Sequence, residues 1–272
     1  MTPLFLDIRG MRLAYYEQHP QHSRTIFFLH GNSSSAKTWN GQWESPLFAG
    51  YRLVAIDLPA HGASGSASNP AADYTLKGLA ALLAEAVDVL ARGPYVICAT
   101  SLATNIAAEM IAFGIKPSGM LLEGASVIGE GVGLDKVTQP GVDISPITMD
   151  EVPEASVKSY SQVVFHVAGE DTRQQFVNDF LRVQAPFRTT IIGSIFSGQM
   201  SDQLGLLTAL ACPVAYVYGR NERVINTGYL SEVDTPKWRN EVQLIPDAGH
   251  LAHVEQPDIF NRLLLSFAQD CL

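Results

Sequence analysis

The sequence predicts one α/β protein with a mostly parallel central sheet that is flanked by helices, and two observations support this. Short apolar segments, typical of strands that are buried on both faces, recur at residues 25–30, 52–58 and 94–99. A segment with apolar residues at helical spacing separates the last two, so the chain alternates strand, helix and strand. Such a pattern implies right-handed crossovers and a parallel sheet covered by helices.

The other elements follow in chain order. Residues 4–8 and 12–17 predict a β-hairpin around Arg9 and Gly10, which precedes the first buried strand. The segment between the second and third buried strands predicts a helix over about 76–90, and another helix follows Ser101. The remaining expected elements are strands at 119–123, 212–219 and within 242–250, a helix near 226–233, and a last helix whose apolar face contains Ile259, Phe260, Leu263, Leu264 and Phe267.

The alternation of strands and helices stops between residues 124 and 200. This stretch has no buried strand pattern but contains helix-like segments, among them 150–167 and 171–184. We expect a helical cap, or lid, which is inserted after the strand that ends near Glu123 and lies over the carboxyl edge of the sheet. The core domain then comprises residues 1–123 and 201–272.

Composition excludes several classes of protein. With 272 residues, 47% hydrophobic and 17% charged, the chain can bury a large core, so it is not a disordered protein. A net charge of -9, with no basic run interleaved with aromatics, argues against a nucleic-acid partner. Three cysteines without CxxC spacing indicate neither a zinc site nor a disulfide framework. No apolar stretch approaches the about 18 residues of a membrane span, so we expect a cytoplasmic protein without a membrane partner.

Polar residues follow the predicted strands where their carboxyl ends meet, which is where open parallel sheets bind ligands. They are His30-Gly31-Asn32, Ser101, Glu123, Glu222 and His250. The chain order is serine, acid and histidine, and the serine lies between a strand and a helix, which is the position of a nucleophile elbow. A serine hydroxyl needs an imidazole to take its proton, and a carboxylate must orient that imidazole. We therefore expect Ser101 to be the nucleophile and His250 the base.

The backbone N–H groups of Asn32 and Leu102 are expected to form an oxyanion hole, because they lie after the first buried strand and after the serine. Ser101 has an alternative role as a plain helix N-cap. His253, three residues after His250, is expected at the start of the next turn or helix. His30, His61 and Asp57 lie in turns, where hydrogen bonds to loop backbone are expected.

Five segments resemble the successive motifs of α/β-hydrolases: HGNSSS (30–35), DLPAHGASG (57–65), TSLATNIAAEMI (100–111), YGRNE (218–222) and DAGHLAHVEQP (247–257). The resemblance covers nearly the whole chain outside the cap and implies the α/β-hydrolase fold. The acid at the usual family position is Glu222, whereas a minority of the fold uses the position of Glu123, and both stay open.

Within this superfamily the sequence is most similar to the metal-independent N-acyl-homoserine lactonases. The shared features are HGNSSS, the SLxxxIxxEMI helix, the Ser159-Tyr160 pair and the DC ending. The resemblance implies no metal and no cofactor, and it places Tyr160, Gly31 and Thr100 at the substrate, although Tyr160 as a packing aromatic of the cap is an alternative.

The elbow departs from the family pattern, since Ala99 and Ala103 stand where glycines are usual, and Ala60 replaces another glycine in LPAHG. An added methyl is tolerated where φ is negative and costly where it is positive.

The sequence leaves three hypotheses for the function. The first is a serine hydrolase of small-molecule esters or lactones, with N-acyl-homoserine lactones (quorum quenching) leading, as a monomer or homodimer. The others are a cofactor-free dioxygenase and a non-catalytic ligand-binding homologue.

Overall fold

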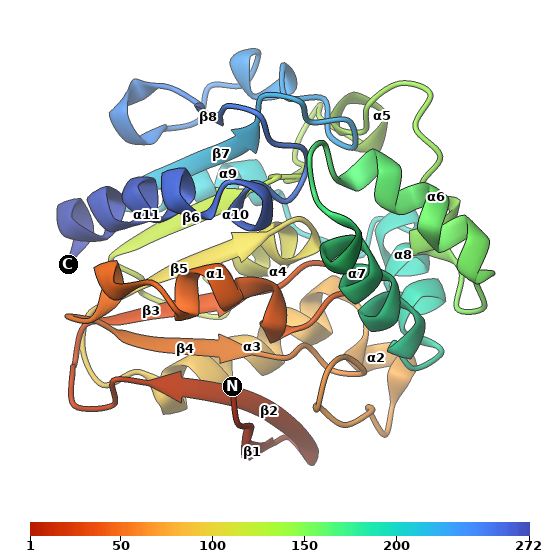
Figure 1. Ribbon diagram of the computed structural model, residues 1–272. Coiled ribbons are helices and arrows are strands. Elements are labelled where there is room, and N and C mark those ends of the chain that lie inside the picture. Colours follow the sequence, from red (N-terminus) through yellow and green to blue (C-terminus); the bar gives the residue numbers. More distant parts are fainter.

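A single eight-stranded sheet forms the centre of the computed structural model, which describes residues 1–272 (Figure 1). The strand order is β1-β2-β4-β3-β5-β6-β7-β8. Strand β2 runs antiparallel to β1 and β4, and all other neighbours are parallel, so the predicted mostly parallel sheet is confirmed. The strands are β1 (Leu4–Ile8), β2 (Met11–Gln18), β3 (Thr25–Leu29), β4 (Arg52–Ile56), β5 (Tyr95–Thr100), β6 (Gly119–Glu123), β7 (Val214–Gly219) and β8 (Gln243–Ile245).

α-Helices occupy the longer connections between the parallel strands, except that from β7 to β8, which contains only 3₁₀ turns. The α-helices are α1 (Asn40–Trp43), α2 (Pro70–Asp73), α3 (Leu76–Leu90), α4 (Leu102–Ile111), α5 (Leu134–Val137), α6 (Glu154–Val164), α7 (Glu170–Arg182), α8 (Phe187–Phe196), α9 (Gln203–Ala209), α10 (Ala252–Glu255) and α11 (Pro257–Cys271). The 3₁₀ turns are η1 (Ala36–Trp39), η2 (Pro46–Phe48), η3 (Ser145–Thr148), η4 (Tyr229–Ser231) and η5 (Trp238–Asn240). None of these helices is both long enough and apolar enough to cross a membrane.

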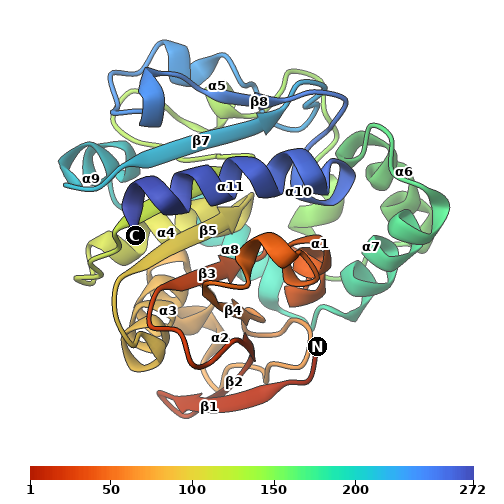
Figure 2. The same cartoon turned by 60° about the vertical axis from the view of Figure 1, so that its left-hand side comes forward.

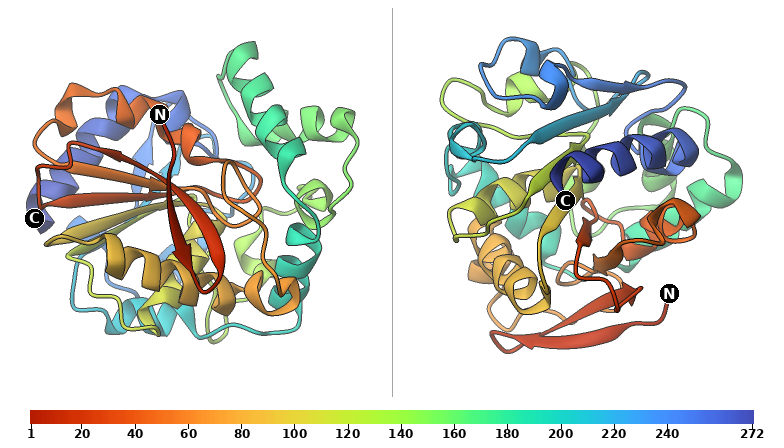
Figure 3. Two further views of the ribbon diagram at one scale, coloured as in Figure 1. Left: turned by 90° about the horizontal axis from the view of Figure 1, so that it is seen from below. Right: turned by 90° about the vertical axis from the view of Figure 1, so that its left-hand side faces the viewer.

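The sheet lies between two layers of helices, with α1 and α11 on one face and α3 and α4 on the other (Figures 2 and 3). Side chains of successive strand residues point to opposite faces, and β3 illustrates this. Phe27 belongs to the buried cluster that contains Leu79 of α3, whereas Phe28 belongs to the cluster that contains Phe260 of α11. All five residues of β3 are buried, which explains why its sequence is continuously apolar.

Helices α5 to α8 fall between residues 124 and 200 and lie beyond the carboxyl ends of the central strands (Figure 1). We propose that residues 124–200 form a cap, and this name is used for them below. Helix α6 begins later than the expected 150–167, because Pro153 precedes it and fits the position before a first helical turn.

The expected helix near 226–233 is wrong, since only the short turn η4 forms there. The side chain of Asn226 accepts a hydrogen bond from the N–H of Gly228 at 3.2 Å. A side chain that bonds its own backbone two residues on competes with helix formation, so the segment adopts a turn.

Candidate active site

Ser101 lies on a strained turn between β5 and α4. Its φ is 53° and its ψ is -126°, a conformation that non-glycine residues rarely adopt and that costs about 1–3 kcal/mol. The side chain makes no capping hydrogen bond to α4, so it does not act as an ordinary N-cap. Backbone bonds fix the turn on both sides: the Ser101 N–H donates to the Glu123 carbonyl at 2.9 Å, and the Ser101 carbonyl accepts from Thr104 at 2.8 Å. The Ser101 side chain borders two cavities that Tyr160 of α6 also lines.

The two alanines beside Ser101 fit without backbone strain. Ala99 and Ala103 are fully buried, and neither has a positive φ. The residue that must stay small is Gly31, because a Cβ there would lie 2.9 Å from Ser101 Cβ and 3.2 Å from the Thr100 carbonyl oxygen. Among the three alanines that replace usual glycines, only Ala60 has a positive φ, of 66°. The two alanines therefore add no strain to the elbow, where Ser101 itself has the positive φ, whereas Ala60 is strained in the loop after β4.

His250 is held by Glu222. Its Nδ1 lies 2.7 Å from Glu222 Oε2, and both side chains are almost completely buried. Glu222 Oε1 accepts the N–H of Val224 at 2.7 Å, so both carboxylate oxygens are bound. Since a carboxylate can only accept, the hydrogen-bond pattern assigns the proton to Nδ1. His250 Nε2 is buried and has no hydrogen-bond partner in the protein, so it is free to accept a proton.

The surroundings of His250 act on its pKa in opposite directions. Burial lowers the pKa of His250, but the charge and hydrogen bond of Glu222, with the charge of Glu123, outweigh it and raise the pKa above the ordinary value. An imidazole of this kind is a stronger base than a free one, which suits a group that must take a proton from a hydroxyl.

Glu123 is bound to a different histidine. Its Oε2 lies 2.6 Å from His253 Nδ1, and its Oε1 accepts the His253 N–H at 2.8 Å. His253 Nε2 in turn lies 2.9 Å from Thr38 Oγ1, and its ring stacks on Trp39 with centroids 4.1 Å apart. His253 lies in α10, as expected, but its complete burial and its pairing with Glu123 were not predicted. The structure brings Glu222, and not Glu123, into hydrogen-bond contact with His250.

The backbone N–H groups of Leu102 and Asn32 have no backbone acceptor in the protein. Leu102 is the first residue of α4, so no preceding turn offers its N–H a helical acceptor. The Asn32 N–H, in the loop after β3, donates no hydrogen bond within the protein. Asn32 lines both cavities beside Ser101, and Leu102 lines the larger of them.

A small cavity of about 30 Å³ joins most of the expected site residues: Gly31, Asn32, Thr100, Ser101, Tyr160 and His250 all line it. A neighbouring cavity of about 100 Å³ shares Asn32, Ser101 and Tyr160 with it. The walls of this second cavity are mainly aliphatic side chains from the cap and from the loop after β7, among them Leu134, Ile192 and Val224. Ser101 thus lies at the junction of a small cavity, which His250 borders, and a larger, mainly apolar one.

Tyr160 of α6 is buried in the cap and faces these cavities. Burial, followed by the charges of Glu222 and Asp143, raises the pKa of Tyr160, so its hydroxyl stays protonated and can donate. The ring also packs near Phe180, at 6.4 Å between centroids. Both interpretations of Tyr160 therefore have a structural basis.

The turn residues behave as expected. His30 Nδ1 donates to the Gly31 carbonyl at 2.8 Å, and His61 Nδ1 donates to the Pro59 carbonyl at 2.8 Å. Asp57 accepts from the Ala36 N–H at 2.7 Å and the Ala63 N–H at 2.8 Å. These groups hold the loops after β3 and β4, and no set of three or more His, Cys, Asp or Glu side chains is arranged to hold a metal ion.

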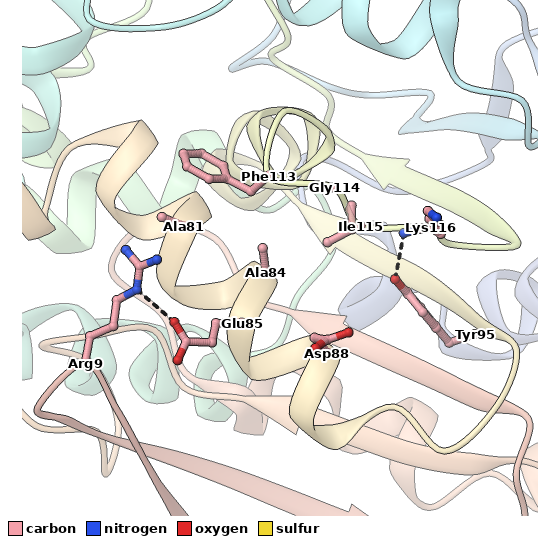
Figure 4. A pocket seen from close by; sticks show the side chains of 10 residues that line it. All are labelled: Arg9, Ala81, Ala84, Glu85, Asp88, Tyr95, Phe113, Gly114, Ile115 and Lys116. Carbon is pink, nitrogen blue, oxygen red and sulfur yellow. Dashed lines mark hydrogen bonds and ion pairs between the residues drawn. The ribbon is translucent and has the colours of Figure 1, made fainter.

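A larger cavity of about 500 Å³ lies on another part of the surface (Figure 4). It is bordered by Arg9, whose side chain pairs with Glu85 at 2.9 Å, and by Tyr95 at the amino end of β5. None of the candidate site residues borders it. It is therefore separate from the candidate active site.

Two features of the site carried only weak signals in the sequence. Gly124 has a φ of 56°, and a Cβ there would lie 2.8 Å from His250 Cε1, so only glycine lets the imidazole approach. Arg188 of the cap reaches the loop after β3 by a hydrogen bond from its Nε to Ser33 Oγ at 2.8 Å. A lone arginine in the cap sequence does not reveal such a contact, because the two residues are far apart in the chain.

Comparison with known proteins agrees with the resemblance in the sequence. Residues 26–263 match the alpha/beta hydrolase family. Among curated relatives, the pimeloyl-[acyl-carrier protein] methyl ester esterase of Nitrosomonas europaea is 24% identical over 245 residues, which cover 86% of this chain and 92% of the relative.

Among solved structures, the N-acyl homoserine lactonase AidH, as a mutant complexed with N-hexanoyl homoserine lactone, aligns with a TM-score of 0.90 and 27% identity over 100% of this chain and 98% of the other. The esterase EaEST of Exiguobacterium antarcticum aligns with a TM-score of 0.78 and 17% identity over 98% and 100% of the two chains. The predicted fold and the predicted resemblance are confirmed.

Proposed function

This chain belongs to the alpha/beta hydrolase family, and we propose that it cleaves carboxylic esters or lactones through an acyl-enzyme on Ser101. The observation that carries the proposal is the strained turn of Ser101, which borders the same cavity as His250, whose Nδ1 is held by Glu222. Backbone strain at a side chain facing a cavity is a feature of functional sites, and here a base and a carboxylate accompany it.

In this mechanism His250 Nε2 takes the proton of the Ser101 hydroxyl while Oγ forms a bond to the carbonyl carbon. The carbonyl oxygen becomes negative and accepts hydrogen bonds from the N–H groups of Asn32 and Leu102. The bond from carbon to the leaving oxygen then breaks, and His250 gives its proton to that oxygen.

Water next attacks the acyl carbon while His250 Nε2 takes one of its protons. The bond between that carbon and Ser101 Oγ then breaks, and His250 gives the proton to Oγ as the acid product leaves. Each step conserves charge and protons with these side chains alone, so the mechanism calls for no metal or cofactor.

N-acyl-homoserine lactones are the substrates that we place first. The named complexes of AidH contain N-hexanoyl homoserine lactone and N-butanoyl homoserine, and AidH is 27% identical to this chain over its whole length. The apolar cavity beside Ser101 suits a short aliphatic acyl chain, and the Tyr160 hydroxyl can donate to a carbonyl of the substrate. With such substrates the protein would quench quorum signals. Its cytoplasmic location and its state as a monomer or homodimer stay predictions.

A panel assay tests this function. Purified protein is given N-acyl-homoserine lactones of increasing chain length and p-nitrophenyl esters, and Ser101→Ala serves as the matched control. We expect Ser101-dependent lactone opening and rapid labelling of Ser101 by a fluorophosphonate probe. Product formation that survives Ser101→Ala but is abolished by chelators would overturn the serine mechanism, and substrate-dependent oxygen uptake would indicate a dioxygenase instead.

A further inference from the structure

Arg188 is a buried cation that has no carboxylate at its guanidinium. Only 2% of the residue is exposed, and its nitrogen atoms donate to the Ser33 hydroxyl and to the carbonyls of Met149, Asp150 and Phe180. The carboxylate of Asp150 binds the backbone N–H of Arg188 at 3.0 Å instead of the guanidinium. Burying a charge with only neutral partners costs free energy. A functional role for the Arg188 cation, or for its fixed hydrogen-bond donors, would explain why it is buried here.

Burial lowers the pKa of Arg188 to about 10, against the opposing charge of Asp150. The guanidinium therefore remains protonated at neutral pH. Its carbon lies 4.3 Å from the centre of the Phe180 ring, so the plane of the group is fixed by an aromatic face as well as by hydrogen bonds.

Ser33 links Arg188 to Asn32, a residue of the candidate oxyanion hole, by two hydrogen bonds. Arg188 Nε donates to Ser33 Oγ at 2.8 Å, and Ser33 Oγ donates to Asn32 Oδ1 at 2.8 Å. The hydroxyl can accept one hydrogen bond and donate the other, so the chain of bonds has one direction. The Asn32 side chain then donates through Nδ2 to the Ile147 carbonyl at 3.2 Å.

The loop that carries Asn32 needs such support. Ser33 has a φ of 60°, a left-handed conformation that is unfavourable for serine and persists only where the surroundings impose it. The Ser33 N–H is held separately, by His61 Nε2 at 3.1 Å. The free N–H of Asn32 belongs to the residue immediately before this strained position.

We propose that Arg188 is a positioning residue of the oxyanion hole, through which the cap holds Ser33 and Asn32 in the geometry that binds the negative oxygen. Both ends of the chain of bonds, Arg188 and Ile147, lie in the cap, whereas Ser33 and Asn32 lie in the core. The cap thus completes the catalytic loop in addition to walling the substrate cavity. This inference rests on the proposed serine mechanism.

The expected effect is a loss in the chemical step and not in substrate binding. An oxyanion donor acts where charge develops in the transition state, and removing one costs about 100-fold to 1,000-fold in kcat. Misplacing such a donor without removing it is expected to cost about 10-fold to 100-fold in kcat, with KM within about threefold.

The test compares Arg188→Met, Ser33→Ala and the double variant on the best ester of the panel. Ser33→Ala breaks the chain of bonds but leaves the cation in place, and the two losses in kcat should not add, because both act through Asn32. Arg173→Met is the matched control, since Arg173 also donates to cap carbonyls, those of Ser161 at 2.7 Å and Ala168 at 3.1 Å, without touching Ser33.

A second readout separates positioning from general loosening of the cap. A trifluoromethyl ketone forms a tetrahedral adduct with an oxyanion, whereas the matching methyl ketone resembles the ground state. We expect Arg188→Met and Ser33→Ala to weaken binding of the trifluoromethyl ketone about 10-fold or more and that of the methyl ketone about threefold or less. Arg173→Met should weaken neither selectively.

Unchanged kcat in folded Ser33→Ala, or an equal loss of affinity for the two ketones, would overturn the inference. If Arg188→Met does not fold, Ser33→Ala alone decides between these outcomes. Activity that survives Ser101→Ala overturns the proposed function, and this result is read separately from the Arg188 series.

Discussion

The carboxylate of Glu123 is bound to His253, with 2.6 Å between Oε2 and Nδ1, although Glu123 ends the strand next to the one that leads to Ser101. Glu222 Oε2, from the loop after β7, lies 2.7 Å from His250 Nδ1. The site therefore contains two acid–imidazole pairs side by side in the fold, and only one of them opens on the cavity of Ser101.

Substitution of Glu222 and of Glu123 should have different effects, the first on kcat and the second on stability. We expect Glu222→Gln to lower kcat by about 10,000-fold, because the amide no longer stabilises the imidazolium or its tautomer. Glu123→Gln should instead lower the free energy of unfolding by about 1–3 kcal/mol, since it disturbs a buried hydrogen-bonded pair, with little change in kcat. Kinetics and thermal unfolding of both variants check this. Loss of activity in a stable Glu123→Gln variant would assign the acid role to Glu123.

Activity should fall at acid pH as His250 becomes protonated. The raised pKa of His250 means that the imidazolium is favoured in the folded protein, so the neutral base is lost at a higher pH than for a free imidazole. We expect the acid limb of the kcat/KM profile to have its midpoint above the ordinary histidine value. Glu222→Gln should move the midpoint of the residual activity downward, because it removes the carboxylate that contributes most to the raised pKa of His250.

The same shift predicts a pH dependence of stability. A group whose pKa is higher in the folded state stabilises it below the unfolded pKa, and this contribution disappears as the pH rises through the folded pKa. The His250 contribution is therefore present at acid pH and lost toward alkaline pH. Comparing unfolding curves of the wild type and Glu222→Gln across this range isolates it, and a contribution that grows with pH would contradict the direction.

Ala60 and Ala103, which stand where glycines are usual, should respond to glycine substitution in opposite directions. Ala60 has a φ of 66°, so Ala60→Gly should relieve backbone strain and raise the free energy of unfolding by up to about 1 kcal/mol. Ala103 lies inside α4, where glycine is unfavourable, so Ala103→Gly should lower it by about 1 kcal/mol. Denaturant unfolding measures both, and stabilisation by Ala103→Gly would show that Ala103 is itself strained.

The apolar cavity should set the preferred length of the acyl chain. Ile192 borders it from α8 and is only partly buried, so a larger side chain can turn into the cavity. Ile192→Phe should lower kcat/KM for long acyl chains about tenfold or more relative to short ones. Ile192→Val is the control, and a uniform loss across all chain lengths would indicate damage to the cap and not a change of cavity length.

The sequence alone determined the sheet and most of its covering helices, because their signals are local. Strand β3 is buried on both faces and is therefore apolar at every position, while α3 has apolar residues at helical spacing. The helix predicted around η4 is wrong for an equally local reason, since the side chain of Asn226 accepts the N–H of Gly228 and so competes with the first helical turn.

The candidate residues Ser101 and His250 also followed from the sequence, since strand ends in a parallel sheet meet at one edge. Three matters depended on the tertiary structure: which acid holds His250, whether the alanines strain the elbow, and what supports Asn32. Each depends on distances of 2.6 to 2.8 Å between residues brought together by packing, or on a single φ angle. Chain order restricts which strand ends can meet, but only the packed cap and loops decide which atoms come within hydrogen-bonding distance.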